Sequence, residues 1–267
     1  MKNVITSLQK DLYENPNKWG KKYHRIDLDR ARLVAKAVPR DVMKILDLGS
    51  GDGLVFNTLR EAGHDPVALD ISRIALRHIH GKVLVQGTAS NLPFSSNSFD
   101  LVIACEVLEH IPNVVYNSVL DEIKRVTKKY VLITVPHNEK LKMNFACCQN
   151  CGCIFNGAYH VRSFQEDNIK FLFKNFKCTR INEIVKILNP DRTSSLELYL
   201  RQHVANEYLY IGASVKCPLC LSMVDQKPDR NWIGWIASGM RYLYRIPVRK
   251  KTPLWYLAVY QKVKKAM

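Results

Sequence analysis

The chain has 267 residues, of which 47% are hydrophobic, and a formal net charge of +16 at pH 7. This length and composition favour a globular protein with a sizeable core, either one large domain or a domain with a smaller subdomain. Residues 1–22 contain no apolar signal-peptide core and no stretch reaches the roughly 20 apolar residues of a membrane span, so we expect a cytoplasmic protein.

The first half of the chain alternates between predicted helices and predicted strands. An N-terminal helical cap is expected from helices at 3–15 and 27–38. Alternation of this kind is typical of a doubly wound α/β fold, whose ligand lies beyond the carboxyl ends of parallel strands. The predicted strands are 44–48, 66–70, 82–86, 101–105 and 130–135, and the helices between them are 54–62, 72–79 and 114–127.

The alternation breaks after residue 136. A helix at 164–176 and strands at 178–187 and 254–259 are expected to complete a mostly parallel, seven-stranded, Rossmann-like sheet, interrupted by a small cysteine-rich insertion. The predicted segments are the helical cap 1–40, the cofactor-binding core 41–136, a first metal-binding segment 137–162, a core helix and strand 163–188, an insertion 189–250 and a final strand and tail 251–267.

The most informative motif is Leu-Asp-Leu-Gly-Ser-Gly-Asp-Gly at residues 46–53, directly after an apolar run. Its glycines allow a sharp turn and let a ligand approach where a Cβ would block it. A dinucleotide-binding motif would need its third glycine at position 54, which is occupied by Leu54. The acidic residue, Asp47, favours hydroxyl groups or a cation as the ligand, and not a pyrophosphate.

Three further motifs follow the next strands in order. Asp70 closes the second strand, where a carboxylate can accept hydrogen bonds from the two hydroxyls of a ribose. Gly-Thr-Ala-Ser begins at Gly87, and Cys-Glu-Val-Leu-Glu-His-Ile-Pro spans residues 105–112. In this order the four motifs closely resemble motifs I to IV of the class I S-adenosylmethionine-dependent methyltransferases of the small-molecule type, over about residues 40–136.

The resemblance implies how S-adenosylmethionine would be held. Asp47 and the glycine loop would bind its amino-acid end, Asp70 its ribose, and Glu106 would flank its methionine moiety. Relatives commonly have Asp at the position of Thr88, so the contact to the adenine amino group is in doubt here. The implied cofactor-binding residues are Asp47, Gly49, Ser50, Gly51, Gly53, Asp70, Ile71, Thr88, Ala89 and Glu106.

Methyl transfer from a sulfonium needs mainly in-line positioning of the acceptor atom. An oxygen or amine acceptor would also benefit from a base, and a histidine suits proton transfer near pH 7. His110 and His137 are the candidates, with His160 as a further one, because all three are predicted on loops at strand ends. His110 could instead have a capping or packing role.

Six of the eight cysteines are clustered along the chain. Cys148 and Cys151 form one Cys-x-x-Cys pair, and Cys217 and Cys220 form another. Two such pairs complete a tetrahedral, structural zinc site, although the 65 residues between them exceed the spacing of a compact ribbon. Alternatives left open are Cys147, Cys153 or His160 as ligands, and buried or free thiols without a metal.

The charge excess is concentrated at the end of the chain. Residues 226–267 contain ten Lys and Arg against one Asp, together with Trp232, Trp235 and Trp255. A basic, aromatic segment favours nucleic acid or an anionic membrane surface, and an ordinary solvated basic surface has the same composition. Peripheral contact with the inner membrane surface is one possibility left open.

The sequence therefore predicts a methyltransferase that acts on a small-molecule, glycan or lipid-linked acceptor at oxygen or nitrogen. The second half weakly resembles microbial methyltransferases associated with surface-glycan synthesis. An RNA methyltransferase, which would bind phosphates through its zinc module and basic tail, is the first alternative, although the Asn-Pro-Pro-Tyr type of motif is missing. A catalytically silent protein that binds S-adenosylmethionine is the second.

Overall fold

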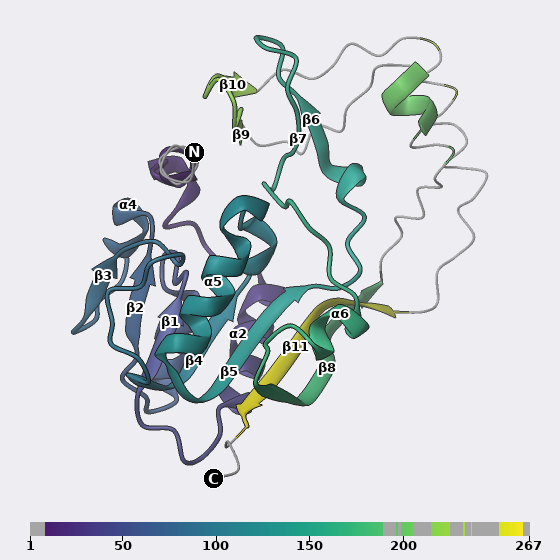
Figure 1. Cartoon of the computed structure of the whole chain (residues 1–267). Helices are drawn as coiled ribbons and strands as arrows, with labels where there is room; N and C mark the ends of the chain where they lie inside the picture. Colours follow the sequence, from purple (N-terminus) through teal and green to yellow (C-terminus); the bar gives the residue numbers. More distant parts are fainter. Residues whose placement is uncertain are drawn as a thin grey trace. The chain divides into compact units, whose positions relative to one another are not determined.

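The computed structural model describes residues 9–188, 196, 199–204, 215–224, 232, 236 and 251–263 (Figure 1). The chain divides into two compact units. The core unit contains residues 1–138, 164–185 and 253–267, and the cysteine unit contains residues 139–163 and 186–252. The N-terminal cap expected over residues 1–40 belongs to the core unit, and residues 1–8 of the predicted first helix lie outside the described residues.

The core unit is built on a seven-stranded sheet of order β3-β2-β1-β4-β5-β11-β8 (Figure 1). The first five strands pair in parallel, and the last strand of the chain, β11, pairs antiparallel with β5. This confirms the predicted fold class. The strands are β1 (Ile45–Leu48), β2 (Val67–Asp70), β3 (Leu84–Gln86), β4 (Phe99–Cys105), β5 (Thr127–Pro136), β8 (Phe176–Leu188) and β11 (Lys251–Lys262).

Most helices of the core unit follow the sequence prediction closely. Residues 9–13 are helical, and the side chain of Ser72 caps α4 by accepting from the backbone N–H of Ala75. The helices are η1 (Pro16–Lys18), α2 (Arg25–Ala37), α3 (Leu54–Glu61), α4 (Arg73–Leu76), η2 (Leu108–His110), α5 (Asn113–Val126) and α6 (Glu166–Lys170), where η marks a 3-10 helix in this unit.

The helix predicted over residues 164–176 is wrong in length, because α6 has only five residues. Its apolar residues Ile169, Phe173 and Phe176 are buried as expected, whereas Phe171 is 84% exposed. They reach the core through an irregular turn in which Asn175 adopts a positive φ of 69°, which an α-helix cannot accommodate. Burial of the aromatic rings, and not helix continuity, explains the apolar pattern.

Both faces of the sheet are covered by helices. Along β4, Leu101 and Ile103 pack with residues of α2 and α3, whereas Val102 and Ala104 pack with residues of α5. Successive side chains of a strand point to opposite faces, so a strand buried on both faces is apolar throughout. The sheet is therefore the middle layer of three, and the loops at its carboxyl edge are left to form a site.

The cysteine unit has its own small core. Two short hairpins contribute to it, β6 (Phe145–Cys147) with β7 (Ile154–Asn156), and β9 (Val215–Lys216) with β10 (Met223–Val224). The unit also contains η3 (Leu141–Asn144) and the single-turn π-helix η4 (Leu200–Val204). The buried residues of its hydrophobic core are Ala146, Cys148, Phe155, Cys217 and Val224.

Only part of the basic segment over residues 226–267 lies within the described residues. Trp232 is 71% exposed, but Trp255 is 9% exposed and packs in β11 within the core of the sheet. Trp255 lies in the strand predicted over residues 254–259, where its ring fills part of the core. Most of residues 225–250, including Trp235, lie outside the described residues. Among the described helices, none is long and apolar enough to cross a membrane.

Candidate cofactor site and cysteine cluster

The turn between β1 and α3 forms the centre of the candidate site. Gly49 and Gly53 adopt φ values of 71° and 97°, which only glycine adopts at little cost. A Cβ on Gly49 would lie 2.4 Å from the Val107 Cγ2 atom. The backbone N–H groups of Gly49 and Ser50 donate to the Leu69 carbonyl, at 2.7 and 3.1 Å. These contacts fix the loop against the end of β2.

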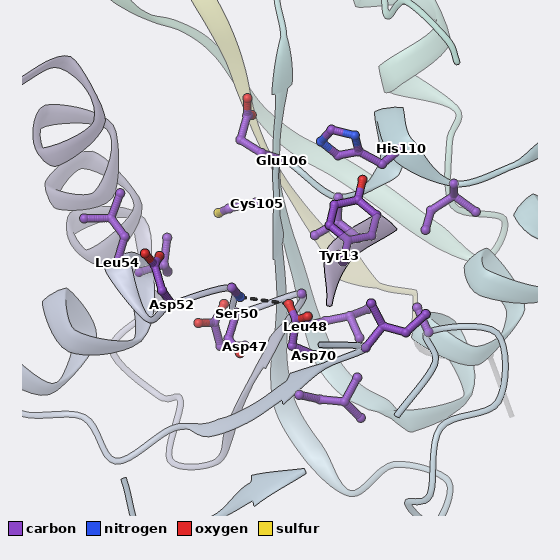
Figure 2. A pocket seen from close by; sticks show the side chains of 18 of the residues that line it. Tyr13, Asp47, Leu48, Ser50, Asp52, Leu54, Asp70, Cys105, Glu106 and His110 are labelled. Carbon is purple, nitrogen blue, oxygen red and sulfur yellow. Dashed lines mark hydrogen bonds between the residues drawn. The ribbon is translucent and has the colours of Figure 1, made fainter. Parts of the chain in front are cut away.

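Two buried carboxylates border this turn. The Asp70 Oδ2 atom accepts the Gly51 N–H at 2.8 Å, and its Oδ1 atom accepts the Ser72 N–H at 2.8 Å (Figure 2). Burial raises the pKa of Asp47 to about 7, and the charge of Asp70 adds to the effect. Burial also raises the pKa of Asp70, although the N–H groups of Ser72 and Gly51 and the charge of Lys18 oppose this.

Both carboxylates and the glycine loop face one cavity of about 360 Å³. Among the predicted cofactor-binding residues, Gly53 is not at its wall; it occupies the N-cap of α3 instead. The predicted residues that line the cavity are Asp47, Gly49, Ser50, Gly51, Asp70, Ile71, Thr88, Ala89 and Glu106. The structure therefore brings together nearly the whole predicted set.

Glu106 lines the cavity, but its carboxylate is already engaged. It accepts the Trp255 indole N–H at 2.6 Å and the Thr134 hydroxyl at 3.2 Å, and an Arg30 nitrogen lies 3.9 Å away. Its backbone has a positive φ of 55°. Figure 2 shows the carboxylate turned away from Asp47 and Asp70. Glu106 thus borders the cavity mainly through its backbone, while its charge holds Arg30 and β11 in place.

The two histidines proposed as bases have different surroundings. His110 lines the cavity, and its ring lies edge-on to the Tyr13 ring at a centroid distance of 6.0 Å. His137 is not among the residues that line this cavity. Its Nε2 atom lies 3.2 Å from a Glu183 carboxylate oxygen, and its ring packs on Tyr256. Only His110 has access to a ligand of the cavity.

Sequence reasoning missed the N-terminal wall of the cavity. Tyr13, Lys18, Trp19 and Tyr23 line it from the segment before α2, and Arg30 lines it from α2. Burial lowers the pKa of Lys18 to about 8, against the opposing effect of Asp70. The available signal was the presence of three large aromatic residues in a segment that is otherwise polar.

The residues of the cavity fit S-adenosylmethionine. The Asp47 Oδ2 and Ser50 Oγ atoms are buried and have no hydrogen-bond partner among the residues that the structure describes. Buried polar atoms are normally hydrogen-bonded, and a carboxylate with a raised pKa is stabilised by an incoming cation. The cofactor's ammonium group would supply that cation, and Asp70 lies where ribose hydroxyls would be bound.

Four cysteine sulfur atoms lie together in the cysteine unit. Cys148 Sγ lies 3.6 Å from Cys220 Sγ, Cys151 Sγ lies 3.6 Å from Cys217 Sγ, and all four lie within 4.8 Å of one another. Sulfur atoms bound at 2.3 Å to one tetrahedral zinc are about 3.8 Å apart. Neither Cys147 nor Cys153 belongs to this cluster, and the His160 Nδ1 atom instead lies 2.5 Å from Glu139. The fold thus joins the two distant pairs.

Comparison with known proteins finds a family match for part of the chain. Residues 46–134 match the model of the family described as "Methyltransferase domain". A demethylmenaquinone methyltransferase of Paenarthrobacter aurescens is 37% identical over 103 residues, which are 36% of this chain and 40% of the relative. An uncharacterized protein of Methanocaldococcus jannaschii is 30% identical over 135 residues, 49% of this chain and 56% of the relative. The chain spans about half the length of such curated relatives.

Solved structures agree in fold. An S-adenosylmethionine-dependent methyltransferase from Methanosarcina mazei superposes with a TM-score of 0.51 at 16% identity, covering 87% of this chain and 98% of that one. A protein from Pyrococcus horikoshii gives a TM-score of 0.51 at 21% identity, covering 65% and 90%. These identities establish the fold alone. Residues 46–134 thus match a methyltransferase-domain family, and most of the chain shares the fold of these structures.

Proposed function

We propose that this chain transfers a methyl group from S-adenosylmethionine to an oxygen or nitrogen atom of a small molecule. The observation that carries the proposal is the single cavity in which Asp47, Asp70 and the glycine loop face one another inside a methyltransferase domain. An intact set of cofactor contacts argues against the alternative of a catalytically silent binding protein.

The chain's own residues would act mainly by positioning. Asp47 would accept hydrogen bonds from the ammonium group, Asp70 would orient the ribose, and the backbone at Gly49 would approach the ligand closely. S-adenosylmethionine, when bound, supplies an activated methyl group on a good leaving group. Fixing the acceptor in line with it contributes roughly 7–11 kcal/mol in favourable cases. His110 is the side chain in the cavity that could take a proton from the acceptor.

The cavity supports a small acceptor with an apolar body. Its wall beyond β4 is formed by Val107, Ile111, Val115 and Val119. Relatives named ubiquinone biosynthesis O-methyltransferase and demethylmenaquinone methyltransferase support a small-molecule acceptor without naming it. A glycan or lipid-linked acceptor is the finer form of the proposal, and the exposed Trp232 supports contact with a membrane surface.

A labelled-methyl screen tests this proposal. The protein is incubated with S-adenosylmethionine carrying a labelled methyl group and with lipid, glycan, small-metabolite, RNA and protein fractions of a cell extract. We expect label in the small-metabolite or lipid fraction. Label confined to RNA, together with RNA binding that falls steeply with salt, would favour the RNA methyltransferase instead. Calorimetry that detects no binding of S-adenosylmethionine would end the enzyme interpretation.

We also propose that Cys148, Cys151, Cys217 and Cys220 hold one structural zinc ion. Four thiolates close the coordination sphere, so the site would have no open position for catalysis. Metal binding to such sites contributes roughly 10–16 kcal/mol in model peptides, which would hold the two hairpins of the cysteine unit together. Elemental analysis of the purified protein should find one zinc per chain; a metal-free, folded cysteine unit would overturn the proposal.

A further inference from the structure

The segment before α2, residues 9–24, runs along the cavity and is attached to the core unit at several points. We call it the strap. Near its start, the Gln9 side-chain amide donates to the His110 carbonyl at 3.0 Å. Five of its residues line the same cavity as the glycine loop, among them Tyr13 and Trp19. The strap and the glycine loop therefore face a shared ligand from two sides.

One attachment point is the carboxylate of Glu14. It accepts the backbone N–H groups of Arg73 and Ile74, at 2.9 and 3.1 Å, and lies 3.4 Å from the Ser72 hydroxyl. These donors belong to the first turn of α4, directly after Asp70. A carboxylate that caps a helix N-terminus is stabilised by the unpaired N–H groups there. Glu14 thus ties the strap to the end of β2.

The other attachment point is Asp52, which belongs to the glycine loop itself. Its Oδ2 atom accepts the Gly20 N–H at 2.9 Å, and its Oδ1 atom accepts the Tyr23 hydroxyl at 2.7 Å. Burial and the hydrogen bond to Asp52 hold the pKa of Tyr23 above its ordinary value, so the hydroxyl remains a donor. The loop that would bind the cofactor is therefore also the loop that holds the strap.

Between these two attachment points the strap directs a cation and an indole ring at the cavity. The Lys18 ammonium lies 4.1 Å from the centroid of the Tyr13 ring and interacts with the charge of Asp70. The Trp19 indole N–H donates to the Tyr13 carbonyl at 2.8 Å. The Trp19 ring would lie only 3.2 Å from a Cβ on Gly51, so it packs directly on the glycine loop.

We propose that the strap closes over the bound cofactor, with Asp52 as its latch and with Lys18 and Trp19 as its contacts to the nucleoside side of the ligand. The proposal depends on the proposed function, since it concerns the same site. A ligand seated against Asp70 lies beneath Lys18 and Trp19. It leaves only when the hydrogen bonds to Asp52 break, so opening of the strap sets how fast the reaction product is released.

The test uses S-adenosylhomocysteine as the probe and compares the full chain with Asp52→Asn, Tyr23→Phe and the control Asp65→Asn. Asp65 is an exposed carboxylate that accepts a hydrogen bond from the Lys82 ammonium group. Stopped-flow displacement measures dissociation of the probe. We expect Asp52→Asn to raise the dissociation rate at least tenfold, equivalent to about 1.4 kcal/mol. Tyr23→Phe, which removes one of the two bonds, should raise it less, and the control should not change it.

Limited trypsin digestion gives a readout that loss of a direct ligand contact would not mimic. The strap contains cleavage sites after Lys18, Lys21 and Lys22. Saturating S-adenosylhomocysteine should slow cleavage there at least tenfold in the unaltered chain and protect Asp52→Asn much less. Unchanged cleavage on binding, or an unchanged dissociation rate in Asp52→Asn, would overturn the strap alone. Failure of the probe to bind the unaltered chain would overturn the proposed function as well.

Discussion

Replacing Asp47 with asparagine should stabilise the ligand-free protein and weaken cofactor binding at the same time. The pKa of Asp47 is about 7 in the folded protein, against an ordinary value of 3.8, chiefly because of burial. A raised carboxylate pKa contributes stability that is complete below pH 3.8 and is lost as the pH rises through 7. The loss corresponds to about 4 kcal/mol, at 1.36 kcal/mol per pH unit.

An asparagine amide has its own desolvation cost, about 1–3 kcal/mol. We therefore expect Asp47→Asn to raise the free energy of unfolding of the ligand-free protein by about 2 kcal/mol at pH 8. For a chain of this size that raises the melting temperature by about 4–8 °C. Losing a hydrogen bond to a charged group costs about 1.5–3 kcal/mol, so the affinity for S-adenosylmethionine should fall about 10- to 100-fold. Thermal melts at pH 5 and 8, with and without ligand, measure both.

Asp100 provides a matched control of opposite sign. The N–H groups of Met43 and Lys44 keep its pKa below the ordinary value, although burial works against them. A lowered carboxylate pKa contributes stability above pH 3.8 that is lost on acidification, so Asp100→Asn should destabilise the protein at pH 8. If Asp47→Asn also lowered the melting temperature and left cofactor affinity unchanged, Asp47 would be a structural residue and the reasoning would be refuted.

Three further substitutions test the turn, the metal site and the Glu106 network. Gly49→Ala should abolish cofactor binding in calorimetry because its Cβ would meet Val107. Gly63→Ala has open space around it, so it should keep cofactor binding and lower the free energy of unfolding by only about 1–2 kcal/mol for its positive φ. Equal cofactor binding in the two variants would contradict this. Cys148→Ser should lose zinc by elemental analysis and Cys153→Ser should keep it; loss in both would mean a different ligand set. Trp255→Phe should lower the free energy of unfolding in urea by about 1–3 kcal/mol, since the Glu106 carboxylate loses its indole donor. Trp232→Phe, at an exposed position, should not lower it. Identical urea midpoints for the two variants would mean that the contact between Trp255 and Glu106 does not stabilise the fold.

The sequence was informative where local chemistry dictates structure. An apolar run followed by Asp47 and alternating glycines can form little other than a buried strand and a tight turn, because neighbouring residues decide both. Asp70 could be placed beside that turn for the same kind of reason, since the ends of parallel strands meet at one edge of the sheet. The prediction of a seven-stranded sheet and of most residues that line the cavity followed from this.

Other features depended on residues far apart in the chain. α6 ends at Lys170, and an irregular turn that includes Asn175 brings Phe173 and Phe176 into the core. Trp255 was counted with a basic tail, although it donates to Glu106, nearly 150 residues earlier. The direction of the Glu106 carboxylate likewise depends on contacts with α2, β5 and β11. All three elements lie outside the motif at residues 105–112.

The sequence by itself predicted the cofactor site, since each of its motifs is a continuous stretch formed by the end of one strand and the turn that follows it. Tertiary structure alone joined Cys148 and Cys151 to Cys217 and Cys220 and laid residues 9–24 against the glycine loop. The physical reason is that a strand or turn is fixed by hydrogen bonds between near neighbours, whereas the latch at Asp52 and the sulfur cluster form only when folding brings distant segments together.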